Sequence, residues 1–147
     1  MRTFKVSHGA LEIIVDLTHP DIYTSFDKVF DTVSIPSTGY LLKPSQFLIS
    51  YTKEHIKLPA YIAARLEGRS TVARYGVSIQ NAPTVQPFWD GNLALEICNL
   101  GKTTILLKKG MPIGQLIFEY IDSPPLKTTL DSVWQGQRPP NLTDMTN

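Results

Sequence analysis

Hydrophobic residues fall in short runs along this chain, and turn-forming residues separate the runs. Such a pattern is typical of β-strands rather than of long helices. Eleven prolines and nine glycines supply many of the separators, and the segments 99–102 and 108–110 have the composition of hairpin turns. The runs predict strands at 9–15, 40–42, 46–51, 76–79, 92–99, 103–107 and 112–121. We therefore predict an all-β domain with short helical turns.

Two helical turns are predicted between the strands. The first covers 59–65, because proline is favourable in the first turn of a helix and Pro59 stands at its start. The second lies between Ser70, a good N-cap residue, and Gly76, a good residue just after a helix end. Ser70 and Arg74 are four residues apart, so this turn would place them on one face.

The strand predicted at 92–99 places a glutamate on its less hydrophobic face. Alternation divides the side chains into two sets, Leu93, Leu95 and Ile97 on one face and Ala94, Glu96 and Cys98 on the other. Glu96 therefore has small neighbours, and its carboxylate has room to front a pocket. A glutamate on a solvated strand face would show the same pattern.

The composition is that of one globular domain. The chain has 147 residues, of which 42% are hydrophobic and 18% are charged, enough for a single core. The net charge of +1 gives no electrostatic basis for binding nucleic acid or membranes. No run is long enough to cross a membrane, and the N-terminus has no signal-peptide core. The single cysteine fits a reducing cytoplasm.

The sequence divides into a β-domain at 1–121 and a tail at 122–147. The tail is polar and rich in proline, with Pro124-Pro125 and Pro139-Pro140. Composition alone favours a disordered tail over one laid across a surface.

Several familiar catalytic motifs are missing from the sequence. A zinc-dependent base deaminase needs an H-x-E and a P-C-x-x-C segment, whereas this chain has one cysteine and three histidines without ligand-like spacing. The chain also lacks a P-loop, a G-x-G-x-x-G fingerprint and a G-x-S-x-G nucleophile elbow. Catalysis would therefore depend on carboxylate, serine, arginine and backbone groups.

Three segments resemble the dCTP deaminase branch of the dUTPase superfamily. They are RSTVARYG at 69–76, WDGNLALE at 89–96 and KGMPIGQL at 109–116. These segments are similar to the family's R-S-S-L-A-R-x-G, G-W-x-G-x-x-x-L-E and G-M-x-I-x-Q-L. Looser similarity covers TKE at 52–54 with LP at 58–59, and WQGQRP at 134–139. Each match alone is weak, but the five together, in family order and near family spacing, are specific.

This resemblance implies a fold, an assembly and a reaction. The fold would be a distorted β-barrel of jelly-roll, dUTPase-like type, assembled as a homotrimer with active sites between subunits. The reaction would be hydrolytic deamination of dCTP to dUTP without zinc, with Mg²⁺ accompanying the phosphates. The tail at 134–140 would close over the nucleotide as a lid, and Gln137 matches a phosphate-binding glutamine.

The resemblance also implies roles for three catalytic candidates. Glu96 matches the family's catalytic glutamate, which takes a proton from the attacking water and returns it. Ser70 and Arg74 match a family pair that would hydrogen-bond phosphate or water and steady negative charge. From the residues alone, a plain helix cap at Ser70 remains an alternative.

Further positions match the family's nucleotide contacts. Asn81 and Ala82 fall where family members read the base with backbone groups. Gln115 matches a glutamine that contacts the nucleotide, although a polar residue on an outward strand position has the same pattern. The substrate-binding candidates are Arg69, Thr71, Asn81, Ala82, Gln86, Ala94, Leu95, Gln115 and Gln137.

Four positions depart from the family pattern. Gln86 replaces an aspartate that contacts the sugar and, in dUTPases, orients the hydrolytic water. An amide forms hydrogen bonds but cannot act as a general base, which argues against pyrophosphate release. Phe88 replaces a glycine, Val133 replaces a lysine, and Pro125 stands about where the family has a phosphate-binding tyrosine.

Three functions therefore remain open. The first is a dCTP deaminase with altered contacts to the triphosphate, and the second is a deaminase of a different cytosine nucleotide. The third is a trimer that binds nucleotides or a protein partner without catalysis. Retention of Ser70, Arg74 and Glu96 favours an enzyme, whereas loss of the aspartate and the lysine favours the other two functions.

Overall fold

The computed structural model describes residues 3–7, 18, 30–80 and 84–123. Within these ranges the chain forms strands, turns and one short helix, α2 (Ser70–Ala73). The strands are β1 (Thr3–Ser7), β2 (Phe30–Ser34), β3 (Tyr40–Leu42), β4 (Phe47–Tyr51), β5 (Ile56–Lys57), β6 (Ile62–Gly68), β7 (Val77–Gln80), β8 (Asp90–Gly91), β9 (Ala94–Asn99), β10 (Ile105–Leu107) and β11 (Gly114–Tyr120). The predicted all-β class is confirmed.

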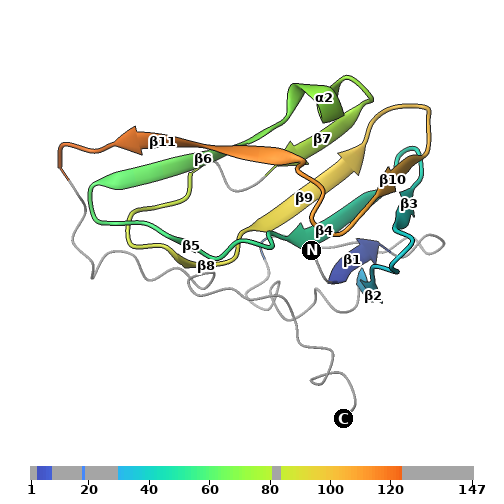
Figure 1. Cartoon of the computed structure of the whole chain (residues 1–147), viewed down its shortest axis with the longest axis horizontal. Coiled ribbons are helices and arrows are strands. Elements are labelled where there is room, and N and C mark those ends of the chain that lie inside the picture. The colour runs from blue at the N-terminus through green and yellow to red at the C-terminus, as the bar shows by residue number, and fades with distance from the viewer. Residues whose placement is uncertain (1–2, 8–17, 19–29, 81–83, 124–147) are drawn as a thin grey trace, which may run out of the picture.

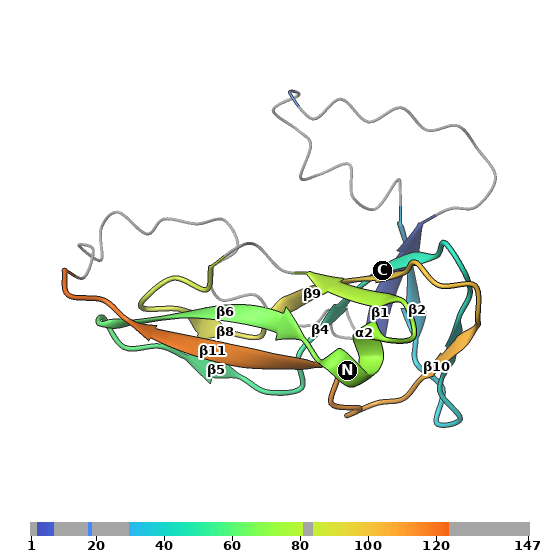
Figure 2. The same ribbon diagram turned by 90° about the horizontal axis from the view of Figure 1, so that it is seen from above.

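The described strands form a five-stranded sheet and three two-stranded ladders (Figure 1). The sheet has the order β2-β1-β4-β9-β7, and the ladders join β10 to β3, β11 to β6 and β5 to β8. Neighbouring strands run antiparallel throughout these pairings. β6 and β11 lie side by side, and α2 follows directly after β6 (Figure 2).

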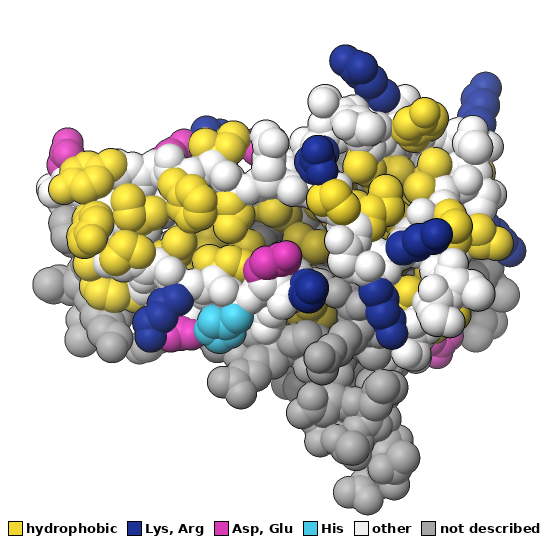
Figure 3. Space-filling view, in the orientation of Figure 1, with side chains coloured by type: hydrophobic (Ala, Val, Ile, Leu, Met, Phe, Trp, Pro, Cys, Tyr) yellow, Lys and Arg dark blue, Asp and Glu magenta, His cyan; other side chains and the backbone are white. Residues whose placement is uncertain are grey.

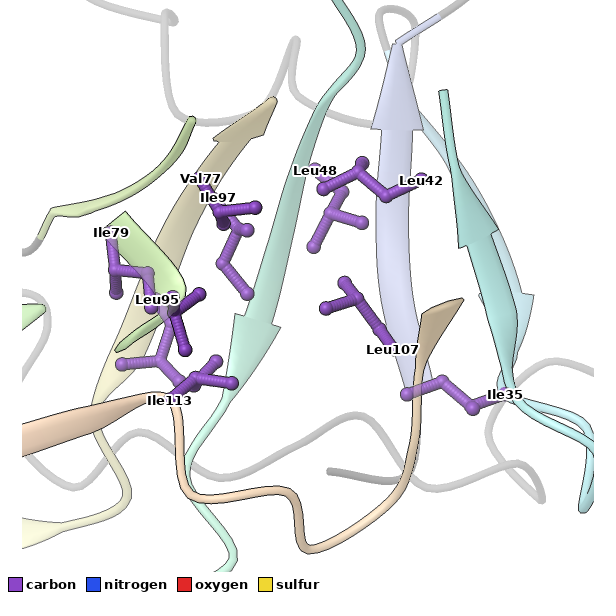
Figure 4. Close-up of a cluster of buried hydrophobic side chains, with 10 residues drawn as sticks. Ile35, Leu42, Leu48, Val77, Ile79, Leu95, Ile97, Leu107 and Ile113 are labelled. Atoms are coloured by element: carbon purple, nitrogen blue, oxygen red, sulfur yellow. The ribbon is translucent and has the colours of Figure 1, made fainter. Parts of the chain in front are cut away.

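The main hydrophobic core lies on one face of the five-stranded sheet (Figure 4). Leu48 of β4 and Ile97 of β9 contribute from the sheet, and Leu42 of β3 and Leu107 of β10 contribute from a ladder. These four side chains are at most 1% exposed. Burying one such side chain stabilises the fold by roughly 1.5–3 kcal/mol, so this contact holds the ladder and the sheet together.

Six of the predicted strand segments overlap an observed strand, namely those at 40–42, 46–51, 76–79, 92–99, 103–107 and 112–121. The strand predicted at 9–15 lies outside the described residues. The helical turn predicted at 59–65 is wrong, because β6 begins at Ile62 after a turn in which Ile62 N donates to Pro59 O (3.3 Å). β11 pairs with β6 along its whole length, and this ladder outweighs a weak local helix preference.

A buried asparagine holds the turn after β9. Asn99 Nδ2 donates to Leu42 O (3.0 Å) and Thr103 O (2.8 Å), and its Oδ1 accepts from Gly101 N (3.0 Å). The turn leads the chain away from β9, so that β10 pairs with β3 and β11 with β6. The segments 99–102 and 108–110 are therefore turns between different pairings, and the hairpin prediction for them is wrong.

Candidate active site

Glu96 lies within the five-stranded sheet, on β9 between β4 and β7. Its register partners are Ile49 on β4 and Gln80 on β7. Burial alternates along β9 as the sequence predicts: Leu95 and Ile97 are buried in the core, and Glu96 is half-buried on the opposite face.

The surroundings of Glu96 raise the pKa of its carboxyl group. Partial burial disfavours the charged form, and this effect outweighs a hydrogen bond with its own backbone that acts in the opposite direction. Ala94 and Cys98, on the same face of the strand, are small and leave space beside the carboxyl group. A carboxyl group with a raised pKa is suited to taking a proton from water and returning it near neutral pH.

Ser70 begins α2 and Arg74 is its C-cap residue, and both side chains are exposed. The N-cap is Arg69 rather than Ser70, and no side chain caps the first turn. Arg69 has an extended backbone because its N–H donates to Ile113 O (3.0 Å) at the approach to β11. The predicted N-cap at Ser70 is thus wrong by one position, and the Ser70 hydroxyl is not engaged as a cap. Gly76 adopts the left-handed φ of +83° expected after a helix end.

Within a single chain, Ser70 and Arg74 lie on a different side of the sheet from Glu96. α2 packs through Val72 into the hydrophobic cluster that contains Leu95. Glu96 leaves β9 on the opposite face from Leu95. Ser70 and Arg74 therefore belong to the core side of the sheet, and Glu96 belongs to the other side.

Three further candidates lie near the ends of α2 and β11. Arg69 makes one long contact, from Nη1 to Pro112 O (3.4 Å). Thr71 is exposed on α2, and Gln115 is exposed on β11, in register with Glu67. These three side chains are therefore accessible to a ligand from the surface.

A cavity of about 430 Å³ opens between β11 and the five-stranded sheet. Figure 3 shows hydrophobic side chains gathered across this hollowed face of the molecule. The lining includes Leu66, Ile79, Leu95, Ile113, Gln115 and Leu116. The side chain of Leu95 thus faces the core and the cavity, whereas Ala94 shares the face of Glu96.

Gln86 and Phe88 belong to one tight turn. Trp89 N donates to Gln86 O (3.2 Å), with Pro87 in the second position and Phe88 in the third at a φ of +64°. This is the arrangement of a type II turn, in which the third position normally requires glycine. Gln86 is exposed and Phe88 is half-buried. Because Phe88 replaces the glycine of the family pattern at a positive φ, its backbone is strained.

A clamp between β4 and β9 was not predicted. Leu93 N donates to Thr52 Oγ1 (3.0 Å), and Asn92 Nδ2 donates to Thr52 O and Glu54 O (both 3.0 Å). Thr52 belongs to a segment that resembles the family, but its partners lie far along the chain. Sequence reasoning therefore had no signal that joined them.

An ion-pair cluster at β8 was also not predicted. Asp90 accepts from His55 Nε2 (2.6 Å) and Lys57 Nζ (3.0 Å) across the β5–β8 ladder. The hydrogen bonds from Lys57 and then His55 hold the pKa of Asp90 below its usual range. The cluster ties the strand after the Gln86 turn to β5.

Several predicted positions lie outside the described residues. They are Asn81, Ala82, Pro125, Val133, Gln137 and the segment 134–140. Within the described ranges, no three His, Cys, Asp or Glu side chains are grouped to hold a metal ion. None of the helical structure described there is long and apolar enough to span a membrane.

Known structures share the fold. The chain superposes on the 2′-deoxycytidine 5′-triphosphate deaminase of Agrobacterium tumefaciens with a TM-score of 0.61 and 19% identity, covering 82% of this chain and 37% of that one. It superposes on the native dUTPase of EIAV with a TM-score of 0.52 and 23% identity. This match covers 65% of this chain and 79% of the dUTPase. The architecture is therefore the dUTPase-like all-β fold that the sequence predicted.

Sequence comparison identifies the family within this fold. Residues 2–121 match the family described as dCTP deaminase-like. A Persephonella marina protein named dCTP deaminase, dUMP-forming is 35% identical over 125 residues, 85% of this chain and 67% of that protein. A protein of the same name from Hydrogenobaculum sp. is 43% identical over 86 residues, 58% and 49% of the two chains. The chain belongs to the dCTP deaminase-like family, and it spans about half to two thirds of the length of these relatives.

Proposed function

We propose that this chain catalyses the hydrolytic deamination of dCTP. The observation that carries the proposal is a half-buried Glu96 with a raised pKa, in a chain of the dCTP deaminase-like family. The names of the relatives support dCTP as the substrate. We propose that Glu96 removes a proton from water as the water adds to C4 of cytosine. The same carboxyl group gives that proton to N3 of the ring, takes the second proton from the new C4 hydroxyl, and transfers it to the leaving amine, so that the C4 carbonyl forms and ammonia departs.

We assign Ser70 and Arg74 to the charged part of the substrate. Ser70 is free of a capping role, and Arg74 is exposed with a permanent charge. Arg69 and Thr71 would add contacts to the phosphates from the same segment. Mg²⁺ would enter with the triphosphate as part of the substrate.

We further infer that the site is completed between copies of the chain. Ser70 and Arg74 lie on the core side of the sheet, and Glu96 lies on the other side. One chain therefore cannot bring the three to one substrate without a partner copy. A homotrimer with sites between subunits supplies that partner and satisfies closed symmetry.

The relatives point to dUMP as the final product. Their name includes dUMP formation, whereas the sequence predicted dUTP because Gln86 cannot serve as a general base. We propose dUMP for this chain as well, with the second hydrolytic water oriented by groups other than Gln86. Pyrophosphate release, measured beside ammonia release, reports this second step directly.

The first test is a turnover assay. The purified chain is incubated with Mg²⁺ and a panel of cytosine and uracil nucleotides, and ammonia and pyrophosphate are measured. Ammonia release from dCTP should fall by at least about 100-fold in Glu96→Gln, because the general base is lost. Glu119→Gln is the matched control, since Glu119 lies on β11 and pairs with Arg65 (2.8 Å).

The other outcomes separate the alternatives. Ammonia released only from another cytosine nucleotide would indicate a changed substrate. Nucleotide binding without turnover would indicate a binding protein on the same scaffold. Ammonia from dCTP without pyrophosphate would contradict dUMP as the product.

A further inference from the structure

Tyr51 is the last residue of β4 and lies on the same face of the sheet as Glu96. Along β4, Ser50 is fully buried on the core side, and Tyr51 follows on the other face. Tyr51 is in register with Ala94, and Ile49 is in register with Glu96. Tyr51 is therefore a diagonal neighbour of Glu96, a separation that aromatic and long side chains can bridge. At the end of β4 it also borders the cavity that Leu95 lines.

The charge of the Glu96 carboxylate acts on the Tyr51 phenol across this half-buried face. Ala94, which lies opposite Tyr51, contributes only a methyl group and leaves space between them. Burial raises the pKa of the Tyr51 phenol, and the negative charge of Glu96 raises it further. Tyr51 therefore keeps its proton throughout the physiological range and remains a hydrogen-bond donor.

The backbone beside Tyr51 is clamped to β9. Thr52 N donates to Leu93 O (2.9 Å), and Leu93 N donates to Thr52 Oγ1 (3.0 Å). Asn92 Nδ2 adds a hydrogen bond to Thr52 O (3.0 Å). Because this clamp begins one residue after Tyr51, it fixes the register between the tyrosine and the strand that carries the glutamate.

Few other groups on this face act on the carboxyl group of Glu96. Among the side chains that the structure describes, β7 presents Ser78 and Gln80, and β9 presents Cys98. Ser78 and Gln80 do not titrate, and Cys98 is a weak donor. β1 places Lys5 in register with Ile49, two strands away from Glu96. Of the neighbouring strands β4 and β7, only β4 thus places a titratable donor, Tyr51, on the face of Glu96.

We propose that Tyr51 is a positioning residue for Glu96, and that its neutral hydroxyl donates to the ionised carboxylate and holds it in one orientation. The catalytic meaning of this inference rests on the proposed deaminase function. A donor stabilises the ionised form of a carboxyl group, so its removal makes ionisation harder. Tyr51→Phe removes only the hydroxyl and keeps the ring.

The first measurement needs no substrate. The side-chain carboxyl carbon of Glu96 is titrated by NMR in the parent chain and in Tyr51→Phe, with Glu96→Gln used to assign the signal. The midpoint should move upward by roughly one pH unit in Tyr51→Phe. Tyr61→Phe is the matched control, because Tyr61 is exposed and contacts the ring of Tyr120; it should leave the midpoint unchanged.

The second measurement is the pH profile of kcat/KM for dCTP. Its acidic limb should move upward with the NMR midpoint in Tyr51→Phe and stay in place in Tyr61→Phe. An unchanged Glu96 midpoint in a folded Tyr51→Phe protein overturns the proposal. If the parent chain does not turn over dCTP, the proposed function fails, whereas the NMR titration still decides whether Tyr51 acts on Glu96.

Discussion

The backbone of Phe88 has a φ of +64°, in the left-handed region that favours glycine. The residue follows Pro87 in a turn closed by a hydrogen bond from Trp89 N to Gln86 O (3.2 Å). The family pattern that the sequence resembles predicts glycine at this position, so the substitution of phenylalanine introduces backbone strain into the turn. Non-glycine residues in strained conformations are often associated with functional sites.

Two substitutions of Phe88 separate the effect of the backbone strain on stability from that of the aromatic ring. Phe88→Ala removes the ring and keeps the strained backbone, whereas Phe88→Gly removes both. Phe88→Gly should therefore be more stable than Phe88→Ala by roughly 0.5–1 kcal/mol, after the greater chain entropy of glycine is subtracted. Urea unfolding of both variants measures this difference, and equal or reversed stabilities would show that the turn is not strained.

Glu96 should make stability depend on pH. Its pKa is raised in the folded chain by burial, so the folded state favours the protonated form. The ionised form therefore lowers stability at pH values above the folded pKa, and this penalty disappears below the unfolded pKa of about 4.3. Relative to the parent, Glu96→Gln should gain stability as the pH rises through this window. Urea midpoints at several pH values measure the gain, and a gain independent of pH would contradict the assignment.

At the scale of elements, α2 depends on a close backbone contact. A Cβ atom on Gly76 would lie 2.6 Å from Gly101 Cα, and one on Gly101 would lie 2.7 Å from Tyr75 O. The end of α2 is thus packed directly on the turn after β9. This contact fixes the position of Ser70 and Arg74 relative to the core.

Two glycine substitutions isolate this contact. Gly76 and Gly110 both have a positive φ, +83° and +74°, but a Cβ atom on Gly110 would meet nothing within 4 Å. Gly110→Ala should cost about 1 kcal/mol of backbone strain. Gly76→Ala should cost a further ~1–3 kcal/mol, because the backbone of Gly101 must move. Thermal unfolding compares the two, and similar losses would mean that the contact relaxes freely.

At the scale of the whole molecule, the sheet separates the catalytic candidates. Val72 anchors α2 on the core side, and Glu96 leaves β9 on the other side. A substrate held by Arg74 of one copy and attacked with the help of Glu96 of another requires a stable assembly. Sedimentation of the purified chain should therefore show a trimer, and a monomer would count against the composite site.

Mixed assemblies test the shared site more sharply. Glu96→Gln and Arg74→Ala chains should each be inactive alone. After unfolding and refolding together, random assortment should leave about a quarter of the sites with an intact glutamate and an intact arginine. Deamination of dCTP should therefore reappear in the mixture. A mixture that stays inactive, while the refolded parent chain is active, would place both residues in one chain.

Much of the site could be predicted because it depends on neighbours in the sequence. Alternation along β9 is a property of consecutive residues, and this property alone is enough to place Glu96 on the face opposite Leu95. The helical turn at α2 also lies where Ser70 and Arg74 indicated it. The cap at Arg69 was missed, because it depends on a hydrogen bond to Ile113, which lies far along the chain.

The sequence by itself determined the all-β class, most strand positions, the face of Glu96 and the family. The tertiary structure decided which strands pair, and β6 became a strand because β11 lay beside it. It also decided that Ser70 and Arg74 lie across the sheet from Glu96, and that Tyr51 lies beside that glutamate. The reason is physical: local patterns fix which way a side chain points, whereas contacts between distant segments form only when the whole chain has packed.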